Sequence, residues 1–252
     1  MKKTGQGHLT DSTRRKDAVL GIVVNEYIKS VTPVSSGYIV KEYILDLSSA
    51  TVRNILAELE KEGYLMHPHT SAGRVPTEEG YRYYVDNLMH EINLLEEEKR
   101  RIQEEYRQGL RDLEAILEKT SEVASNLTHY TSIVAVDDIP DKIFCRGRSY
   151  LVEYTEPQEI LKIRHILEAL ERKEHILEII NRNLERKIEI FIGHELAASS
   201  IESCSMAISR FATKSGSRGR IAVLGPTRMD YQRVVSTLEY LSNVIEGILI
   251  RH

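Results

Sequence analysis

The sequence lacks several features that mark specialised classes of protein. Its 252 residues include only two cysteines, Cys145 and Cys204, with no CxxC pair and no nearby pair of histidines. This pattern indicates reduced thiols rather than a disulfide framework or a zinc site. No apolar run approaches the roughly 20 residues of a membrane span, and no apolar segment follows the basic N-terminus as in a signal peptide. We therefore expect a cytoplasmic protein with no membrane association and no metal.

Signs of catalysis are also missing. The sequence has no Walker or GxGxxG pattern, and no grouping of nucleophile, base and oxyanion donors can be assembled from it. We predict no catalytic residues, no cofactor and no turnover. The 41% hydrophobic and 29% charged residues are ordinary for a protein with packed cores, and the length suits a small module plus one further domain.

Residues 12–90 carry the signals of a winged helix-turn-helix domain, preceded by a flexible arm at 1–11. Apolar residues at helical spacing predict helices over about 12–30, from Ser35 or Ser36 onward, and over about 49–62, where Gly63 ends the helix. A short strand at 64–66 and a loop at 67–74 follow. Thr77 then opens a further helix that we expect to extend toward residue 125.

The start of the third helix, SSATVRN, is the strongest chemical signal. Ser49 and Thr51 can bond phosphate oxygens beside the free N–H groups of a helix start. Arg53 and Asn54 lie opposite the apolar face, and these residue types suit guanine and adenine edges in a major groove. An alternative is equally open for this heptapeptide alone, in which Ser48 or Ser49 is only an N-cap and Arg53 only a surface charge.

The loop HTSAGRVPT predicts the wing. Thr70, Ser71 and Arg74 surround Gly73, and an arginine at a wing tip can reach phosphate or a minor groove. His67 and His69 are interpreted as turn residues or phosphate neighbours rather than metal ligands. The tyrosines at 81, 83 and 84 could stack on bases, but their helical spacing favours core packing.

The charge of the chain neither supports nor excludes nucleic-acid binding. The net charge is -4, and residues 1–90 contain 11 Lys and Arg against 11 Asp and Glu. A uniformly basic domain would favour nucleic acid more clearly. Sequence-specific binders can nevertheless concentrate cations on one face.

Residues 91–125 are mostly charged, with leucine, isoleucine and tyrosine at helical steps. They predict a linker helix that pairs with a second copy or, as an equal alternative, a solvated helix lying on the next domain. Residues 126–252 predict an α+β domain on a small sheet. We expect strands at 132–136, 150–154, 188–192 and 221–224 and helices at 157–184 and 226–250, while 199–211 is ambiguous. The segments GHE (193–195) and GPTRM (225–229) follow strands, and we interpret them as turns rather than ligand loops.

Several of these stretches resemble the bacterial heat-inducible transcription repressor family HrcA. They are PVSS at 33–36, SSATVRN with LAELEKEGYL behind it, PHTSAGRVPTEEGYRYYVD, IGHE, and VLGPTRMDYQRVVSTLEYL. The resemblance covers residues 12–90 strongly and 145–250 moderately.

The resemblance implies an N-terminal winged-helix domain and a GAF-like C-terminal domain. It also implies a homodimer that binds an inverted-repeat operator on double-stranded DNA and represses chaperone operons, with the chaperonin as a partner that keeps the repressor active. The matching recognition positions are Ser49, Thr51, Arg53 and Asn54, with Thr70, Ser71 and Arg74 in the wing.

One departure is visible. The family has a longer middle region between a strand like 132–136 and the stretch 147–151, which here are about ten residues apart. The part credited with dimer contacts and some of the GAF-like sheet is thus shortened or absent, and the second domain is reduced. Two other functions stay open: a ligand-sensing winged-helix regulator, and a protein-interaction module.

Overall fold

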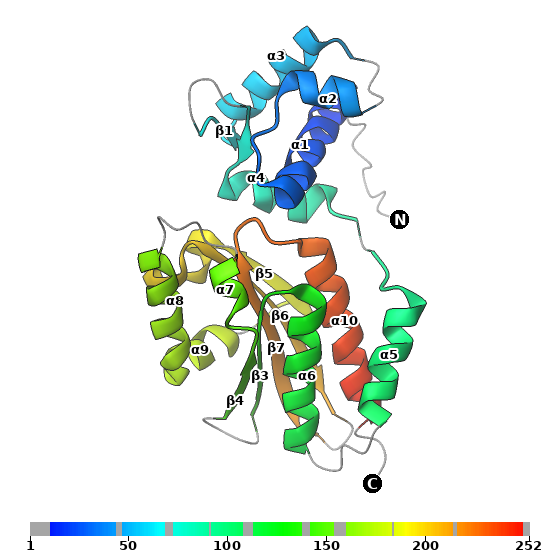
Figure 1. The fold of residues 1–252 in the computed structure, drawn as a ribbon, viewed down its shortest axis with the longest axis vertical. Helices are drawn as coiled ribbons and strands as arrows, with labels where there is room; N and C mark the ends of the chain where they lie inside the picture. The colour runs from blue at the N-terminus through cyan, green and yellow to red at the C-terminus, as the bar shows by residue number, and fades with distance from the viewer. Residues whose placement is uncertain are drawn as a thin grey trace, which may run out of the picture. The chain divides into compact units, whose positions relative to one another are not determined.

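The chain forms two compact units, residues 1–89 and 90–252, here called the N-terminal and C-terminal units. The computed structural model describes residues 11–43, 47–68, 73–90, 92–107, 113–137, 142–153, 160–182, 184–213 and 216–248 (Figure 1). Each unit has its own apolar core and is described by itself.

The N-terminal unit is helical with one short hairpin (Figure 1). Helices α1 (Asp11–Ser30), α2 (Ser36–Glu42) and α3 (Ser49–Lys61) precede strands β1 (Leu65–Met66) and β2 (Val75–Pro76). The strands pair antiparallel. Helix α4 (Glu78–Tyr83) follows and passes into a π-helical turn, Tyr84–Leu88.

Side-chain caps explain where these helices begin. The hydroxyls of Ser35, Ser48 and Thr77 accept the N–H groups of Tyr38, Thr51 and Gly80, respectively. Such bonds satisfy N–H groups that the first turn of a helix leaves free. After α3 the chain reverses at Gly63, whose φ of 86° lies in the left-handed region that favours glycine. The core behind these ends includes Val19, Leu20, Val23, Ile39, Val52, Leu56, Leu59, Leu65, Tyr81 and Tyr84.

A five-stranded antiparallel sheet with strand order β4-β3-β7-β6-β5 organises the C-terminal unit. Its strands are β3 (Thr131–Val136), β4 (Ile143–Arg146), β5 (Ile188–Ile192), β6 (Cys204–Ala212) and β7 (Arg218–Pro226). The helices are α5 (Glu96–Arg107), α6 (Leu113–Thr128), α7 (Tyr150–Glu153), α8 (Ile160–Glu171), α9 (Lys173–Ile180) and α10 (Tyr231–Ile248). Two 3-10 turns, Gly193–Leu196 and Ser199–Ile201, lie between β5 and β6.

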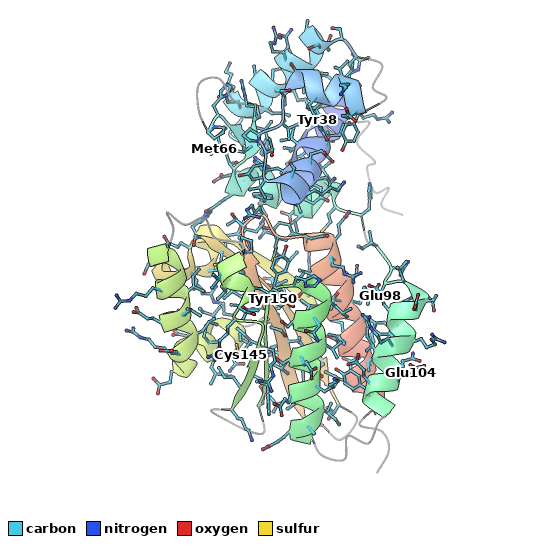
Figure 2. The ribbon with its side chains drawn as sticks, in the orientation of Figure 1. Tyr38, Met66, Glu98, Glu104, Cys145 and Tyr150 are labelled. Carbon is cyan, nitrogen blue, oxygen red and sulfur yellow. The ribbon has the colours of Figure 1, made fainter. Side chains whose placement is uncertain are left out.

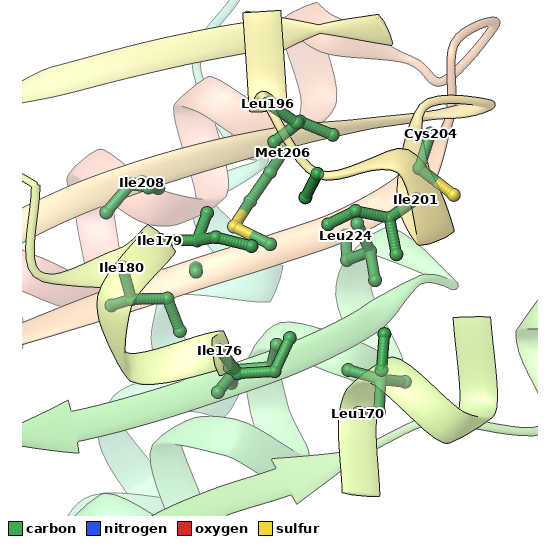
Figure 3. Packing of buried hydrophobic residues seen from close by; sticks show 14 of the residues in the cluster. Leu170, Ile176, Ile179, Ile180, Leu196, Ile201, Cys204, Met206, Ile208 and Leu224 are labelled. Atoms are coloured by element: carbon green, nitrogen blue, oxygen red, sulfur yellow. The ribbon is translucent and has the colours of Figure 1, made fainter. Parts of the chain in front are cut away.

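The two faces of this sheet pack against different helices. Alternate residues of β6 point to opposite faces, so Met206 and Ile208 join an apolar cluster with α8 and α9 (Figure 3). On the other face, Ser205 and Ser209 meet α10, where their hydroxyls lie 2.9 Å from Tyr231 Oη and 2.6 Å from Ser242 Oγ. Helix α6 covers β3 on that same face.

Helix α5 lies against α10 and α6. Arg233 of α10 forms an ion pair with Glu98, and Gln103 donates to Tyr240 at 3.1 Å. Tyr106 and Thr120 share a buried hydrogen bond of 2.6 Å.

The long helix expected from Thr77 toward residue 125 is wrong as one continuous element. The backbone is extended at Met89, and the described part of 90–95 is not helical. Leu94 is buried there and the carbonyl of Ile92 accepts a hydrogen bond from Ser236 of α10. These tertiary contacts hold the segment against α10, and helical periodicity alone cannot anticipate them.

Other expectations in the C-terminal unit need correction. The strand predicted at 150–154 is helix α7, because the chain turns at Gly147 (φ 76°) and Tyr150, Leu151 and Val152 donate to carbonyls three residues earlier. The helix predicted at 157–184 is two helices, α8 and α9. The ambiguous region contains β6, and the closing helix begins at Tyr231 rather than Pro226, which ends β7. The strands expected at 132–136, 188–192 and 221–224 are confirmed within β3, β5 and β7.

Candidate nucleic-acid interface

The N-terminus of α3 presents hydroxyl groups and free backbone N–H groups. Ser48 is the N-cap, and its Oγ lies 2.9 Å from Thr51 Oγ1 and accepts the Thr51 N–H at 3.1 Å. The first turn contains no acidic residue, unlike that of α4, which contains Glu78 and Glu79. No acidic side chain therefore offsets the partial positive charge of this helix end, which favours the approach of a phosphate.

Arg53 and Asn54 extend from the face of α3 that is opposite the core. Both are exposed, whereas Val52, Ile55 and Leu56 on the same turns are buried. Neither side chain has a hydrogen bond or ion pair with another described residue. The helix thus separates a packed face from a polar face that is free to bind.

The N-terminus of α2 adjoins that of α3. Ser36 Oγ and Ser49 Oγ are 3.5 Å apart, the limit of a hydrogen bond. The first turn of α2, like that of α3, lacks acidic residues. Two helix starts with serine hydroxyls therefore lie side by side.

The hairpin packs directly against the start of α2. Arg74 and Val34 exchange two backbone hydrogen bonds, of 2.8 and 2.9 Å. A Cβ at Gly73 would lie 2.4 Å from both the carbonyl carbon and the oxygen of Val34. Only glycine permits this approach, so the glycine of the SAGR motif fixes the hairpin beside the two helix starts.

The side chain of Arg74 braces the hairpin. Its Nη2 forms a 2.8 Å ion pair with Glu60 Oε2 on α3, and its Nη1 lies 2.8 Å from His67 Nδ1. The side chain is 15% exposed. It therefore lies at the base of the wing, between α3 and β1, instead of at the tip where the sequence predicted it. Thr70 and Ser71, together with His69, lie outside the described residues.

The sequence did not reveal the contacts that hold α1 behind this surface. Glu26 of α1 accepts hydrogen bonds from the hydroxyls of Tyr38 and Tyr43, at 2.5 and 2.7 Å, and these donors lower the pKa of its carboxyl. Tyr83 of α4 donates to Asp17 at 2.9 Å, and burial with this bond raises its pKa to about 12. Nothing in the sequence spacing signals these pairs, because their members come from different helices.

The tyrosines of the EEGYRYYVD segment are largely internal. Tyr81 and Tyr84 are buried, and the Tyr84 hydroxyl donates to Asn25. Core packing, favoured from their spacing, is confirmed for these two residues. Gly80 has a structural role, because a Cβ there would lie 2.1 Å from the carbonyl oxygen of Tyr64.

The loop motifs of the C-terminal unit also have structural roles. Glu195 of GHE accepts the Ile192 N–H at 2.9 Å, and Arg182 donates to the carbonyls of Glu195 and Leu196. After GPTRM, Asp230 accepts the Arg233 N–H and so caps α10. The interpretation of both segments as turns agrees with these bonds.

Other site types find no support in the part of the chain described. No group of three potential metal ligands occurs among those residues, and none of their helices is long and apolar enough to cross a membrane. The space between the sheet and α8 and α9 is filled by isoleucine and leucine (Figure 3). An open cavity of about 390 Å³ lies at the edge strand β4.

Comparison with known proteins decides the family. Residues 95–235 match the model of the HrcA protein C-terminal domain. The chain belongs to the HrcA family. A heat-inducible transcription repressor HrcA from Geobacter sulfurreducens is 26% identical over 96% of this chain and 99% of the relative. One from Carboxydothermus hydrogenoformans is 29% identical over 93% of this chain and 97% of the relative.

These HrcA relatives differ in length from this chain. The alignment with the Geobacter protein runs over 339 positions, more than the 252 residues here, so that relative has segments with no counterpart in this chain. The HrcA relatives are named as transcription repressors, which agrees with the expected absence of catalysis. A crystal structure of a hypothetical protein superposes with a TM-score of 0.72 at 20% identity, covering 96% of this chain and 98% of that one, and supports the fold.

Proposed function

We propose that this chain is a dimeric, sequence-specific repressor that binds an inverted-repeat operator upstream of heat-shock operons. In this proposal residues 1–11 are an arm, 12–90 a winged helix-turn-helix domain, 91–125 a linker region, and 126–252 a reduced GAF-like domain. One observation carries it: Arg53 and Asn54 extend, without partners among the described residues, from a helix whose first turn has no acidic residue.

The packing around α3 suits insertion into a major groove. The core side of α3 is fixed by four buried residues, Val52, Ile55, Leu56 and Leu59. In this proposal the hydroxyls of Ser49 and Thr51 bond the phosphates that flank the groove, and Arg53 and Asn54 contact base edges. The adjoining start of α2 supplies further donors to the same backbone.

The wing contributes in two ways. Thr70 and Ser71 are the proposed wing contacts with phosphate. Arg74 acts through its ion pair with Glu60, which holds the hairpin against the recognition helix α3. We also infer that its positive charge attracts the DNA backbone, so that its loss should weaken binding to every sequence alike.

The family suggests the partners of this activity. Relatives carry the name heat-inducible transcription repressor, so we infer that heat lifts repression by this chain as well. We extend the proposal to a homodimer on two half-sites and to the chaperonin as the partner that keeps the repressor active. A regulator that reads chromosomal DNA acts in the cytoplasm.

Footprinting on chaperone-operon promoters of the source genome tests the proposal. The full chain should protect a two-fold symmetric segment, and a gel shift with that duplex should give tight binding. Arg53→Ala and Asn54→Ala should each reduce discrimination between this duplex and one with altered half-sites by about 1–3 kcal/mol, or roughly 5- to 150-fold.

A matched control comes from the same helix. Lys61 is an exposed cation in the last turn of α3, far along the helix from Ser49. Lys61→Ala should leave discrimination unchanged. Equal losses for Arg53→Ala and Lys61→Ala would indicate general electrostatic attraction instead of base reading, and the proposal would then be wrong.

A further inference from the structure

The strand β4 forms an edge of the sheet in the C-terminal unit. It pairs with β3 on one side, and none of the described residues pairs with it on the other. An open edge offers a row of backbone donors and acceptors to another strand. Figure 1 shows β4 at the end of the sheet next to β3.

The hydrogen-bond pattern identifies which backbone groups of β4 face outward. Asp137 donates its N–H to the Arg218 carbonyl, so odd-numbered residues of β3 bond to β7 and even-numbered ones to β4. Val134 is opposite Phe144, and Ser132 is opposite Arg146. Ile143 and Cys145 therefore direct their N–H and C=O groups away from the sheet.

The opposite edge, β5, is protected. The outward N–H of Ile192 is bonded by the Glu195 carboxylate, and the Glu189 carboxylate accepts the N–H groups of Glu185 and Arg186. Arg182 also lies 5.4 Å from the Phe191 ring centre. Charges and folded-back loops of this kind prevent strand addition.

Charges at β4 have the reverse arrangement. Two cations, Lys142 just before the strand and Arg146 at its end, form ion pairs with Glu114 and Glu118 of α6. An edge whose cations are already paired does not repel a second strand as free lysines would. The side chains of Ile143, Phe144 and Cys145 are half-buried and apolar.

An open cavity with charged residues in its wall lies beside this edge. It has a volume of about 390 Å³, and its wall includes Arg148 and Glu171 besides β4. Both of these side chains are exposed, and neither has an ion-pair partner among the described residues, although Arg148 Nε donates to Cys145 Sγ at 3.4 Å. A two-fold axis brings such a patch against itself, so each copy offers the charge that the other lacks.

We propose that β4 is a dimer interface, at which two copies of this chain pair antiparallel to form one continuous ten-stranded sheet. The register that uses the outward groups of both copies places Ile143 opposite the partner's Cys145, with the two-fold axis at Phe144. Each such pair exchanges two backbone hydrogen bonds. The contact is short, so the dimer is weak in free solution and is reinforced by DNA through effective concentration.

This inference deepens the proposed function, because an inverted repeat requires two copies. The two can fail separately. If the chain stays monomeric but still protects single half-sites in footprinting, the DNA-binding proposal stands and the proposed interface is wrong.

Thiol cross-linking tests the register. Side chains at the two Cys145 positions would be diagonal neighbours, about 8 Å apart, while Cys204 is 2% exposed and out of reach. A short bismaleimide added to the full chain should give a covalent dimer that persists in Cys204→Ser and disappears in Cys145→Ser. A dimer by sedimentation that does not cross-link through Cys145 would overturn the proposal, as would a monomer at all concentrations.

Proline substitution tests the backbone contacts. Ile143→Pro removes an outward N–H at the first residue of the strand and keeps the bonds to β3. It should weaken dimerisation at least tenfold by sedimentation. The matched variant Ile143→Val keeps the N–H and should dimerise normally. Far-ultraviolet circular dichroism would verify that both variants fold, and normal dimerisation of a folded Ile143→Pro would contradict the interface.

Discussion

The two units place their polar side chains in opposite ways. In the N-terminal unit, no described serine, threonine, amide or charged side chain is fully buried, and polar contacts such as Glu26 with Tyr38 and Arg74 with Glu60 lie near the surface. Among the described residues of the C-terminal unit, twelve serines and threonines are buried, mostly between the sheet and helices α6 and α10. The first unit keeps its polar side chains near the surface, whereas the second buries hydroxyl groups, most of which are hydrogen-bonded within the unit.

The largest effect should come from the apolar core of the C-terminal unit. Leu224 of β7 is fully buried in the cluster with α8 and α9 (Figure 3). Leu224→Ala should lower the free energy of unfolding by about 2–5 kcal/mol, because it removes buried methyl groups and leaves a cavity. Urea titration of the full chain measures the change. A loss below 1 kcal/mol would mean that this layer is loosely packed and would weaken the comparison.

The braced surface of the N-terminal unit should respond to pH. The pKa of Glu26 lies below its ordinary value of 4.5 because the hydroxyls of Tyr38 and Tyr43 donate hydrogen bonds to its carboxylate. Tyr38 is labelled in Figure 2. A lowered carboxyl pKa stabilises the folded state above the unfolded pKa, and this stability is lost as the pH falls through the folded pKa. Glu26→Gln should therefore cost about 1–2 kcal/mol at pH 7 and much less at pH 3.

Thermal melts from pH 7 to pH 3 would measure this difference. The matched variant Lys29→Gln removes only an exposed partner of Glu26 and should have little effect. If the wild type and Glu26→Gln lost stability in parallel as the pH fell, the Glu26 carboxylate would not be the group that stabilises this part of the unit.

Local signals in the sequence predict the N-terminal unit well. Ser35, Ser48 and Thr77 are N-cap residues, and Gly63 directly follows the C-cap of α3. Each marks a helix end that the structure confirms. These features depend on neighbours within four residues along the chain. The outward positions of Arg53 and Asn54 follow from helical period in the same way.

Features fixed by distant contacts could not be predicted. The sequence suggests a strand at Tyr150, but the chain turns at Gly147, whose φ is 76°. A Cβ there would lie 1.9 Å from Ser125 Oγ and 2.7 Å from the Tyr130 carbonyl oxygen, so packing against another element requires glycine. The sequence suggests that Arg74 lies at the tip of the wing, but its contacts with Glu60 and His67 hold it at the base of the wing. In both cases the deciding partner is a residue from another element, which periodicity and propensity do not include.

The hydroxyl-rich layer of the C-terminal unit should tolerate loss of an unpaired hydroxyl. Thr237 of α10 is fully buried, and its Oγ1 has no hydrogen-bond partner in the described part of the chain. Thr237→Val keeps the shape and removes the cost of burying that group, so the free energy of unfolding should rise by about 1 kcal/mol. Ser242→Ala, which removes a hydroxyl bonded to Ser209 and Leu238, should lower it instead. Destabilisation by both changes would show that the layer depends on every hydroxyl.

The smallest effect should come from one strained turn in the N-terminal unit. Val31 follows α1 with a φ of 55°, a left-handed conformation that is unfavourable for a β-branched residue, and its side chain is 40% exposed. Val31→Gly should raise the free energy of unfolding by roughly 0.5–1 kcal/mol, because relief of strain exceeds the entropy that glycine adds to the unfolded chain. Gly63→Ala at φ 86° is the opposite change and should lower it by a similar amount. If Val31→Gly stabilises the protein and leaves DNA affinity unchanged, the strain at Val31 has only a local effect on stability. If it stabilises the protein but weakens DNA binding, the conformation of this turn contributes to the DNA-binding surface.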